Sequence, residues 1–78
     1  MQVNDLIKKL NKFQGDSQVV ISGYEGGLAD VINAKEISIK RDVNKEWYYG
    51  RHEQASPEEP GAIRAVMIVA EQRTEDSE

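Results

Sequence analysis

The stretch VNDLIKKLNKFQGDSQVVIS, residues 3–22, joins a helical pattern to a β pattern and is the best guide to the fold. Its first apolar residues are spaced by three positions or by one, which places them on one side of a helix: Val3, Leu6, Ile7, Leu10 and Phe13. The lysines at positions 8, 9 and 12 fall outside this stripe, near the end that favours cations. We predict a helix over residues 3–13, closed by Gly15 in the left-handed conformation.

The second half of this stretch predicts the first strand. Residues 18–22 form a short β-branched run between two glycines, which suits a strand buried on both faces. Further along, Ile32 and Ala34 occupy even positions, whereas Ile37 and Ile39 occupy odd ones. Because side chains alternate across a strand, this change of parity predicts a second strand that is bulged or bent near Lys35.

The remaining elements follow from composition. Residues 46–50 predict an aromatic strand, and residues 51–61, which hold both prolines, predict a loop. Residues 62–70 predict a central strand. We expect one domain over residues 1–72 and a disordered acidic tail over residues 73–78.

Together these elements predict an α+β fold. One N-terminal amphipathic helix packs on a small, mostly antiparallel sheet of about four strands. A single helix covers only one face of such a sheet, so we expect a homo-oligomer in which another copy covers the other face.

Composition excludes several classes of function. The chain has 78 residues, a formal net charge of −4, no cysteine and one histidine. It therefore has no disulfide framework and no thiolate metal site, and the charge argues against a general affinity for nucleic acid. The absence of a signal-like or membrane-spanning apolar run predicts a cytoplasmic protein with no membrane partner.

A glycine-rich segment, residues 23–27 (GYEGG), carries the first candidate site. Glycines permit close approach of a backbone whose N–H groups can accept an anion. Tyr24 and Glu25 suit the stacking and polar reading of a planar ligand, with Gly26 and Gly27 beside them. The simpler interpretation, a hairpin turn that requires glycine, stays open.

The second candidate site lies in residues 44–53, which contain the only tryptophan and the only histidine. An extended backbone would place Trp47 with Arg51 on one face and Tyr48 with His52 on the other. The simpler interpretation is that the aromatic residues belong to a core or an interface. Ligand contacts are predicted at Asn44, Trp47, Tyr48, Arg51 and His52.

No motif for catalysis or cofactor binding is present. His52 and Glu53 are adjacent and would point to opposite faces of a strand, so they would not form an acid–base pair. The carboxylates match no metal-coordination loop, and the serines accompany no nucleophile motif. We therefore expect a protein that is not an enzyme, with no cofactor, no metal and no catalytic residue.

Most of the chain resembles small uncharacterised proteins encoded by bacteriophages and prophages. The resemblance rests on VNDLIKKL (3–10), DSQVVISGYEGG (16–27), VN (43–44) and WYYGRHE (47–53). Arg51 stands where those proteins carry a proline after the Tyr-Gly pair. The resemblance implies an accessory protein in the host cytoplasm, and some such proteins are sponges that sequester cyclic-nucleotide signals of bacterial immunity.

Two functional hypotheses follow. In the first, the chain sequesters a small nucleotide-like ligand in a pocket between subunits, built from the GYEGG segment and the aromatic segment. In the second, it is an interaction module that inhibits a host protein through its exposed sheet and acidic loop. A structural or virion-associated role is a third interpretation.

Overall fold

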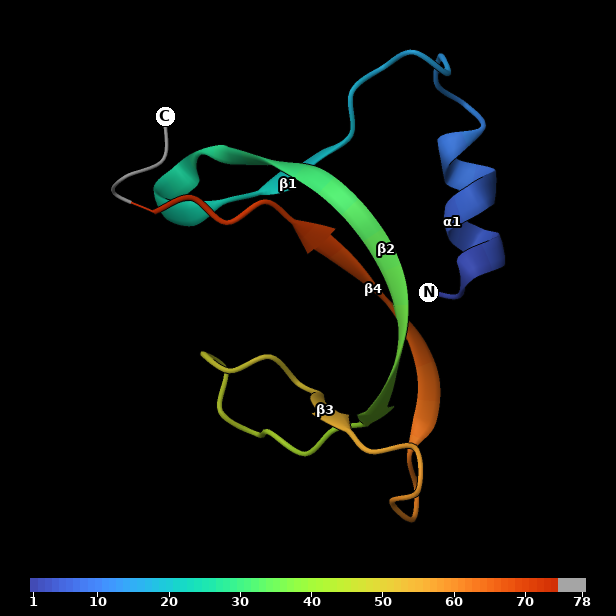
Figure 1. Cartoon of the computed structure of the whole chain (residues 1–78), viewed down its shortest axis with the longest axis vertical. Coiled ribbons are helices and arrows are strands. Elements are labelled where there is room, and N and C mark those ends of the chain that lie inside the picture. Colours follow the sequence, from blue (N-terminus) through green and yellow to red (C-terminus); the bar gives the residue numbers. More distant parts are fainter. Residues whose placement is uncertain (75–78) are drawn as a thin grey trace. The chain divides into compact units, whose positions relative to one another are not determined.

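A computed structural model of the chain describes residues 1–74 and confirms the α+β fold class. Figure 1 shows one N-terminal helix and a four-stranded, mostly antiparallel sheet. In chain order the elements are α1 (Val3–Leu10), β1 (Val20–Ser22), the short 3-10 helix η1 (Tyr24–Gly26), β2 (Leu28–Lys40), β3 (Glu53–Ala55) and β4 (Ile63–Ala70).

The chain divides into two compact units. The first comprises Met1–Asn33 with the segment from Val69 on, and the second comprises Ala34–Ile68. Both β2 and β4 therefore contribute residues to each unit. Whether residues 1–72 fold as one domain stays a prediction. Of the predicted acidic tail, residues 75–78 lie outside the described residues.

Helix α1 forms because its first turn is capped. The Gln2 backbone N–H donates to the Asp5 carboxylate at 2.8 Å, which satisfies one of the free donors of that turn. The helix ends at Leu10, so the predicted end at residue 13 is wrong. The N–H groups of Lys12 and Phe13 bond to the carbonyls three positions back, as Phe13 does to Leu10 at 3.1 Å. These tighter turns end the helix before Gly15, which does not take the predicted left-handed conformation.

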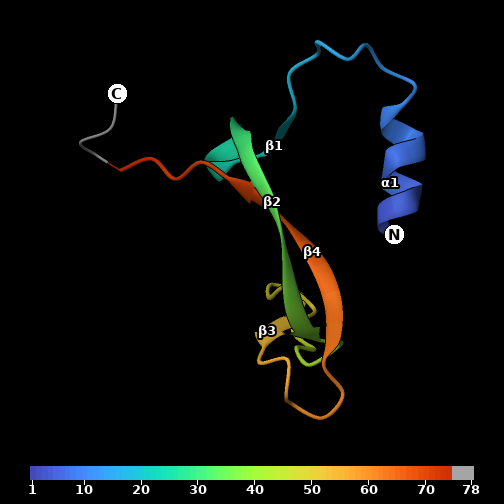
Figure 2. The same cartoon turned by 45° about the vertical axis from the view of Figure 1, so that its right-hand side comes forward.

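The sheet is organised around β2, which pairs with each of the other three strands. The antiparallel partners β1 and β3 lie opposite the two ends of β2, with Val20 facing Asp30 and Ala55 facing Ser38. In Figures 1 and 2, β4 runs alongside β2 in the opposite direction. The central strand is thus β2, and the prediction that residues 62–70 form the central strand is wrong.

Two hydrogen bonds place β1 and β4 on opposite edges of β2. The Val31 N–H donates to the Val19 carbonyl at 3.4 Å on the β1 side. The neighbouring Asp30 carbonyl accepts from the Glu71 N–H at 2.9 Å, just beyond the end of β4. Successive residues of an antiparallel strand direct their peptide groups to opposite edges, so these two bonds point in opposite directions.

Strand β2 is continuous over its 13 residues. The change of parity near Lys35 falls beside the point where β2 passes from the first unit to the second. Ala29, Asp30 and Val31 are half-buried in the first unit, and Ile37, Ser38 and Ile39 in the second, with an exposed run between them. The change of parity therefore marks the place where the side chains of β2 stop packing in the first unit and begin packing in the second.

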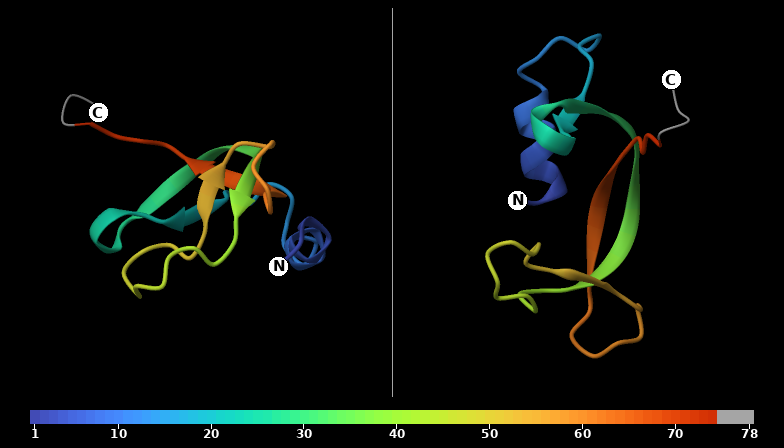
Figure 3. Two further views of the ribbon diagram at one scale, coloured as in Figure 1. Left: turned by 90° about the horizontal axis from the view of Figure 1, so that it is seen from below. Right: turned by 90° about the vertical axis from the view of Figure 1, so that its left-hand side faces the viewer.

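The predicted aromatic strand over residues 46–50 is wrong. These residues lie in the connection between β2 and β3, which Figure 3 shows as a loop joining two adjacent arrows. A turn in which the Tyr49 N–H donates to the Glu46 carbonyl at 3.1 Å interrupts any extended backbone. The strand lies later, at Glu53–Ala55, inside the predicted loop 51–61. Turn hydrogen bonds here override the β propensity of three consecutive aromatic residues.

No residue among positions 1–74 is buried. The apolar stripe of α1 is exposed at Val3, Ile7 and Leu10. The prediction that the first strand is buried on both faces is also wrong, because β1 has three residues and all are exposed. Large apolar side chains thus remain in contact with water in both units. Exposed apolar surface of this kind is typical of sites where a partner binds.

Candidate functional site

The first candidate site is the connection between β2 and β3, residues 41–52, which we call the aromatic loop. Asn44 fixes its conformation from within. The Asn44 side-chain amide donates to the Gly50 carbonyl at 2.9 Å, and its backbone N–H donates to the Arg51 carbonyl at 3.1 Å. Asn44 is the half-buried residue of this loop. Its side-chain NH2 group and its backbone N–H therefore hold the loop, and the ligand contact expected at Asn44 stays a prediction.

The base of the aromatic loop is held at Asp42. This residue has a φ of 57°, in the left-handed region that aspartate tolerates better than most side chains. Its N–H donates to the His52 Nδ1 at 3.0 Å, so this ring nitrogen is an acceptor and the neutral imidazole carries its proton on Nε2. The Asp42 carboxylate also lies 3.6 Å from the Arg51 Nε, and both side chains are exposed.

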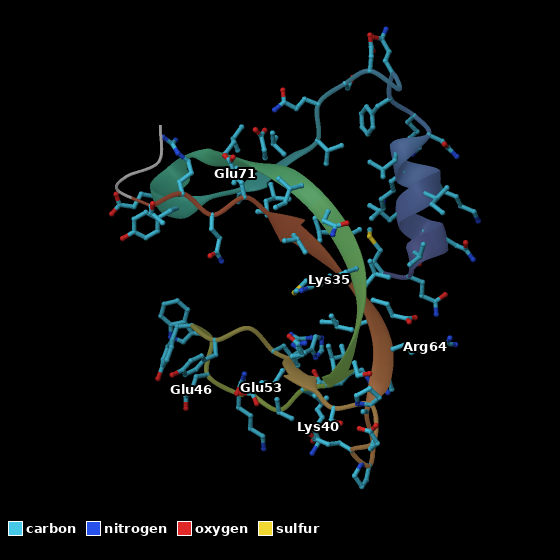
Figure 4. The ribbon with its side chains drawn as sticks, in the orientation of Figure 1. Lys35, Lys40, Glu46, Glu53, Arg64 and Glu71 are labelled. Atoms are coloured by element: carbon cyan, nitrogen blue, oxygen red, sulfur yellow. The ribbon has the colours of Figure 1, made fainter. Side chains whose placement is uncertain are left out.

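These contacts present three aromatic rings at the end of the loop. Trp47 is 91% exposed, and Tyr48 and Tyr49 are 63% and 62% exposed. The Trp47 and Tyr48 rings lie edge to face with centroids 5.7 Å apart, and the Tyr48 and Tyr49 rings are 5.1 Å apart. Figure 4 shows side chains gathered at this end of the loop, beside the labelled Glu46. The rings contact one another and form one exposed aromatic cluster, not a part of a core.

The GYEGG segment is the connection of the β1–β2 hairpin, as the simpler interpretation stated. Ser22 pairs with Leu28, and Tyr24–Gly26 between them form η1, with Gly23 and Gly27 at its two ends. The Gly23 N–H donates to the Gly27 carbonyl at 2.8 Å, and the Gly27 N–H donates to the Tyr24 carbonyl at 3.2 Å. Two of the N–H groups that were expected to accept an anion are thus used to close the turn.

The centre of this turn takes left-handed backbone conformations. Gly26 has a φ of 82°, and Glu25, which has a side chain, has a φ of 50° and a ψ of 44°. Glycine tolerates this region without cost, whereas Glu25 adopts it at some energetic expense. The Glu25 side chain is exposed.

A cavity of about 330 Å³ lies beside this turn. Tyr24, which is 89% exposed, lines it together with Leu28 and Ala29. The other lining residues follow β4: Glu71, Arg73 and Thr74. An aromatic ring, a guanidinium and a carboxylate around one cavity can hold a planar ligand that carries both donor and acceptor groups.

The predicted contacts therefore fall into two groups. Tyr24, Glu25, Gly26 and Gly27 lie in the first unit, and Asn44, Trp47, Tyr48, Arg51 and His52 lie in the second. Sequence reasoning missed Glu71 and Arg73. Their place at the Tyr24 cavity depends on the bond between Glu71 and Asp30, a long-range pairing that no local pattern reveals.

A second cavity, of about 540 Å³, is formed by residues from the end of α1 to the start of β1. Its apolar lining comes from Leu10, Phe13, Val19 and Val20. None of the predicted contacts lines it.

The structure also bears on metals and membranes. In residues 1–74 there is no group of three or more histidine, aspartate or glutamate side chains that could hold a metal ion. None of the helices in this part of the chain is long and apolar enough to cross a membrane.

Comparison with protein-family models, curated proteins and solved structures found no match for this chain. The resemblance to phage-encoded proteins therefore stays a prediction.

Proposed function

We propose that this chain is a non-enzymatic binding protein that recognises another protein through the aromatic loop. The observation that carries the proposal is the exposure of Trp47, Tyr48 and Tyr49 on a loop whose own hydrogen bonds hold it in place. Exposed aromatic clusters are uncommon on monomers without a binding role. The phage context implied by the sequence resemblance makes a bacterial host protein the proposed partner.

The composition of the loop matches that of binding hot spots. Tryptophan, tyrosine and arginine are the residues most enriched among side chains that dominate interface energetics, and Trp47, Tyr48 and Arg51 supply all three. Burying one such ring removes about 150–250 Å² from water, roughly 4–6 kcal/mol at about 25 cal/mol per Å² before the costs of association. The hydrogen bonds of Asn44 and Asp42 reduce the ordering cost of the loop.

The net charge of the aromatic loop indicates the sign of the charge expected on the partner surface. Three cations, Arg41, Lys45 and Arg51, and two anions, Asp42 and Glu46, give the loop a formal charge of 3 − 2 = +1 with His52 neutral. The whole chain carries −4. The proposed partner surface is an apolar pocket that accepts the Trp47 and Tyr48 rings and has an acidic rim.

The test is binding to an identified partner. The tagged chain is expressed in the bacterial host, co-purifying proteins are identified by mass spectrometry, and the interaction is measured again with both components purified. We expect the Trp47→Ala and Tyr48→Ala variants each to weaken binding by about 30-fold or more, the effect of losing a hot-spot residue. Phe13→Ala, at an exposed aromatic residue outside the aromatic loop, is the matched control and should change affinity by less than about threefold.

Two outcomes would contradict this proposal. One is that no co-purifying protein binds the purified chain directly. The other is that a direct partner binds the aromatic variants as tightly as the unchanged chain. Binding to phospholipid vesicles that is lost in the Trp47→Ala variant, with no protein partner, would assign the cluster to a membrane surface and also contradict the proposal.

The Tyr24 cavity favours a second candidate function, the sequestration of a small nucleotide-like ligand. Tyr24 would stack on a base, Arg73 would meet a phosphate, and Glu71 would accept from a base edge. A pocket shared between subunits would add residues of the aromatic loop. Calorimetry with a panel of cyclic di- and trinucleotides tests this function. Heat that disappears in Tyr24→Ala and Arg73→Ala would support it, and no heat with any member of the panel would exclude it.

A further inference from the structure

Strand β4 has an edge that the sheet leaves open. Within residues 1–74 the strand partner of β4 is β2, and β2 lies along one edge of it. The Glu71 N–H points to β2, where it bonds to the Asp30 carbonyl. Since peptide groups alternate between the two edges of an antiparallel strand, the even-numbered residues of β4 direct theirs outward. These residues are Arg64, Val66, Ile68 and Ala70.

This open edge has few of the features that protect edges in monomeric proteins. Such edges are short, or carry lysine, proline or a bulge. Strands β1 and β3 have three residues each, whereas β4 has eight. The β4 sequence, IRAVMIVA, contains no proline and no lysine, and Arg64 is its one charged residue. Figure 4 shows the Arg64 side chain extending outward from β4.

The side chains of β4 are also partly uncovered. Ala65, Met67 and Val69 alternate as the half-buried residues of one face. On the other face Val66 is 48% exposed and Ile68 is 39% exposed. Pairing at the edge would bring a second set of apolar side chains beside each of these faces.

We propose that the outer edge of β4 pairs with β4 of a second copy of this chain, antiparallel and about a two-fold axis at Met67, so that two four-stranded sheets become one. An axis of this kind runs perpendicular to the sheet, so facing residues share a face of the sheet and their numbers share parity. Centring the axis on Met67 aligns Arg64 with Ala70 of the second copy and Val66 with its Ile68. This register uses every outward-directed peptide group of β4.

Charge favours the same register. Arg64 of each copy lies opposite Ala70 of the other copy. Since Arg64 and Ala70 are six residues apart on one strand, the two Arg64 residues are separated by the same six positions along the strands. At about 3.4 Å per residue the two guanidinium-bearing positions are about 20 Å apart along the strands, well beyond the Debye length of about 8 Å at physiological salt. The aligned segment between them is wholly apolar. No like charges face each other across the pairing.

The mass of the purified full-length chain in solution tests the dimer. By sedimentation equilibrium across the micromolar to millimolar range, we expect a species of twice the 8.8 kDa chain mass. Ile68→Lys places a charge at the edge and should weaken dimerisation by about tenfold or more. The matched control is Val43→Lys, which adds the same charge at a loop residue of similar exposure, 42%, and should leave the dimer intact. Circular dichroism shows whether each variant is folded.

Several results would overturn this proposal: a monomer at all concentrations, a dimer unaffected by Ile68→Lys, or a dimer equally weakened by Val43→Lys. If Ile68→Lys does not fold, the pairing at the β4 edge is tested by amide hydrogen exchange in the unchanged chain. Dimerisation at the edge requires the Val66 and Ile68 N–H groups to exchange more slowly as concentration rises, while those of Met67 and Val69 do not change. Exchange that shows no such alternation would refute the pairing. A Trp47→Ala variant that loses the dimer would assign it to the aromatic loop instead.

Discussion

Asn44→Ala should loosen the aromatic loop without unfolding the protein. The substitution removes the 2.9 Å hydrogen bond from the side-chain amide to the Gly50 carbonyl, and it leaves the backbone bond to Arg51 possible. A single hydrogen bond of this kind contributes about 0.5–1.5 kcal/mol net. Gly50 is exposed, so water can replace the lost donor, and we expect the lower half of that range, about 0.5–1 kcal/mol. At 25 °C this corresponds to an open loop populated about two to five times more.

Amide hydrogen exchange measures this change residue by residue. The Asn44 and Tyr49 N–H groups, which bond to Arg51 and Glu46 within the loop, should exchange about two to five times faster in the variant. Since Trp47 is the only tryptophan, its fluorescence anisotropy reports the same loosening independently. Lys45→Ala, at the neighbouring exposed position, is the control and should leave both readings unchanged.

Exchange in the loop that did not change in Asn44→Ala would contradict this prediction. A free energy of global unfolding, measured in urea, that fell by as much as the local free energy would also contradict it. In the first case Asn44 does not hold the loop. In the second, the loop and the rest of the chain would open as one unit, and the cluster would not be a separately ordered recognition element.

Two further predictions concern the turns. Gly26→Ala should reduce the free energy of unfolding by about 1 kcal/mol, because the alanine must adopt the φ of 82° found there. Gly50→Ala is the control and should be close to neutral, since Gly50 has no left-handed φ and a Cβ there would meet no atom within 4 Å. Urea denaturation that gave both variants the same free energy of unfolding would contradict this. The Ser56 hydroxyl donates to the Glu58 carboxylate and holds the pKa of Glu58 below its ordinary value of 4.5, so this contact contributes stability above pH 4.5 that is lost as the pH falls through the lowered pKa. Ser56→Ala should raise the pKa of Glu58 in an NMR titration, and an unchanged titration would exclude Ser56 as the cause.

Local patterns in the sequence predicted part of this structure correctly. The spacing of Val3, Leu6, Ile7 and Leu10 indicated α1 because helical periodicity is a local property. Residues 23–27 indicated a hairpin turn because Gly26 needs a conformation that few other residues adopt. The N-terminal helix and the mostly antiparallel sheet were predictable on these grounds.

The aromatic segment was misread because β propensity reports packing on a pleated surface. The three aromatic residues do not pack on a sheet but lie in a loop, at Trp47, Tyr48 and Tyr49. The loop is closed by the hydrogen bond from the Asn44 side chain to the Gly50 carbonyl, six residues later in the sequence. A side chain-to-backbone bond of this separation has no periodic signature. The candidate site was therefore recognised from its residue types, but its geometry was not.

The Tyr24 cavity shows a second limit of sequence reasoning. Glu71 and Arg73 line it because the end of β4 bonds to β2 at Asp30. The residues involved are some forty positions apart in the sequence. Only knowledge of which strands are neighbours places them together, and that pairing is a property of the whole sheet.

Photo-crosslinking from position 47 in living bacteria tests the central claim most directly. Trp47 is replaced by a photoreactive aromatic amino acid, and a chain carrying the same amino acid in place of Phe13, also an exposed aromatic residue, serves as the control. A recognition role for the aromatic loop predicts a covalent adduct between the chain and one other protein, formed from position 47 and not from position 13. No adduct from position 47, or an adduct only with a second copy of this chain, would contradict the account.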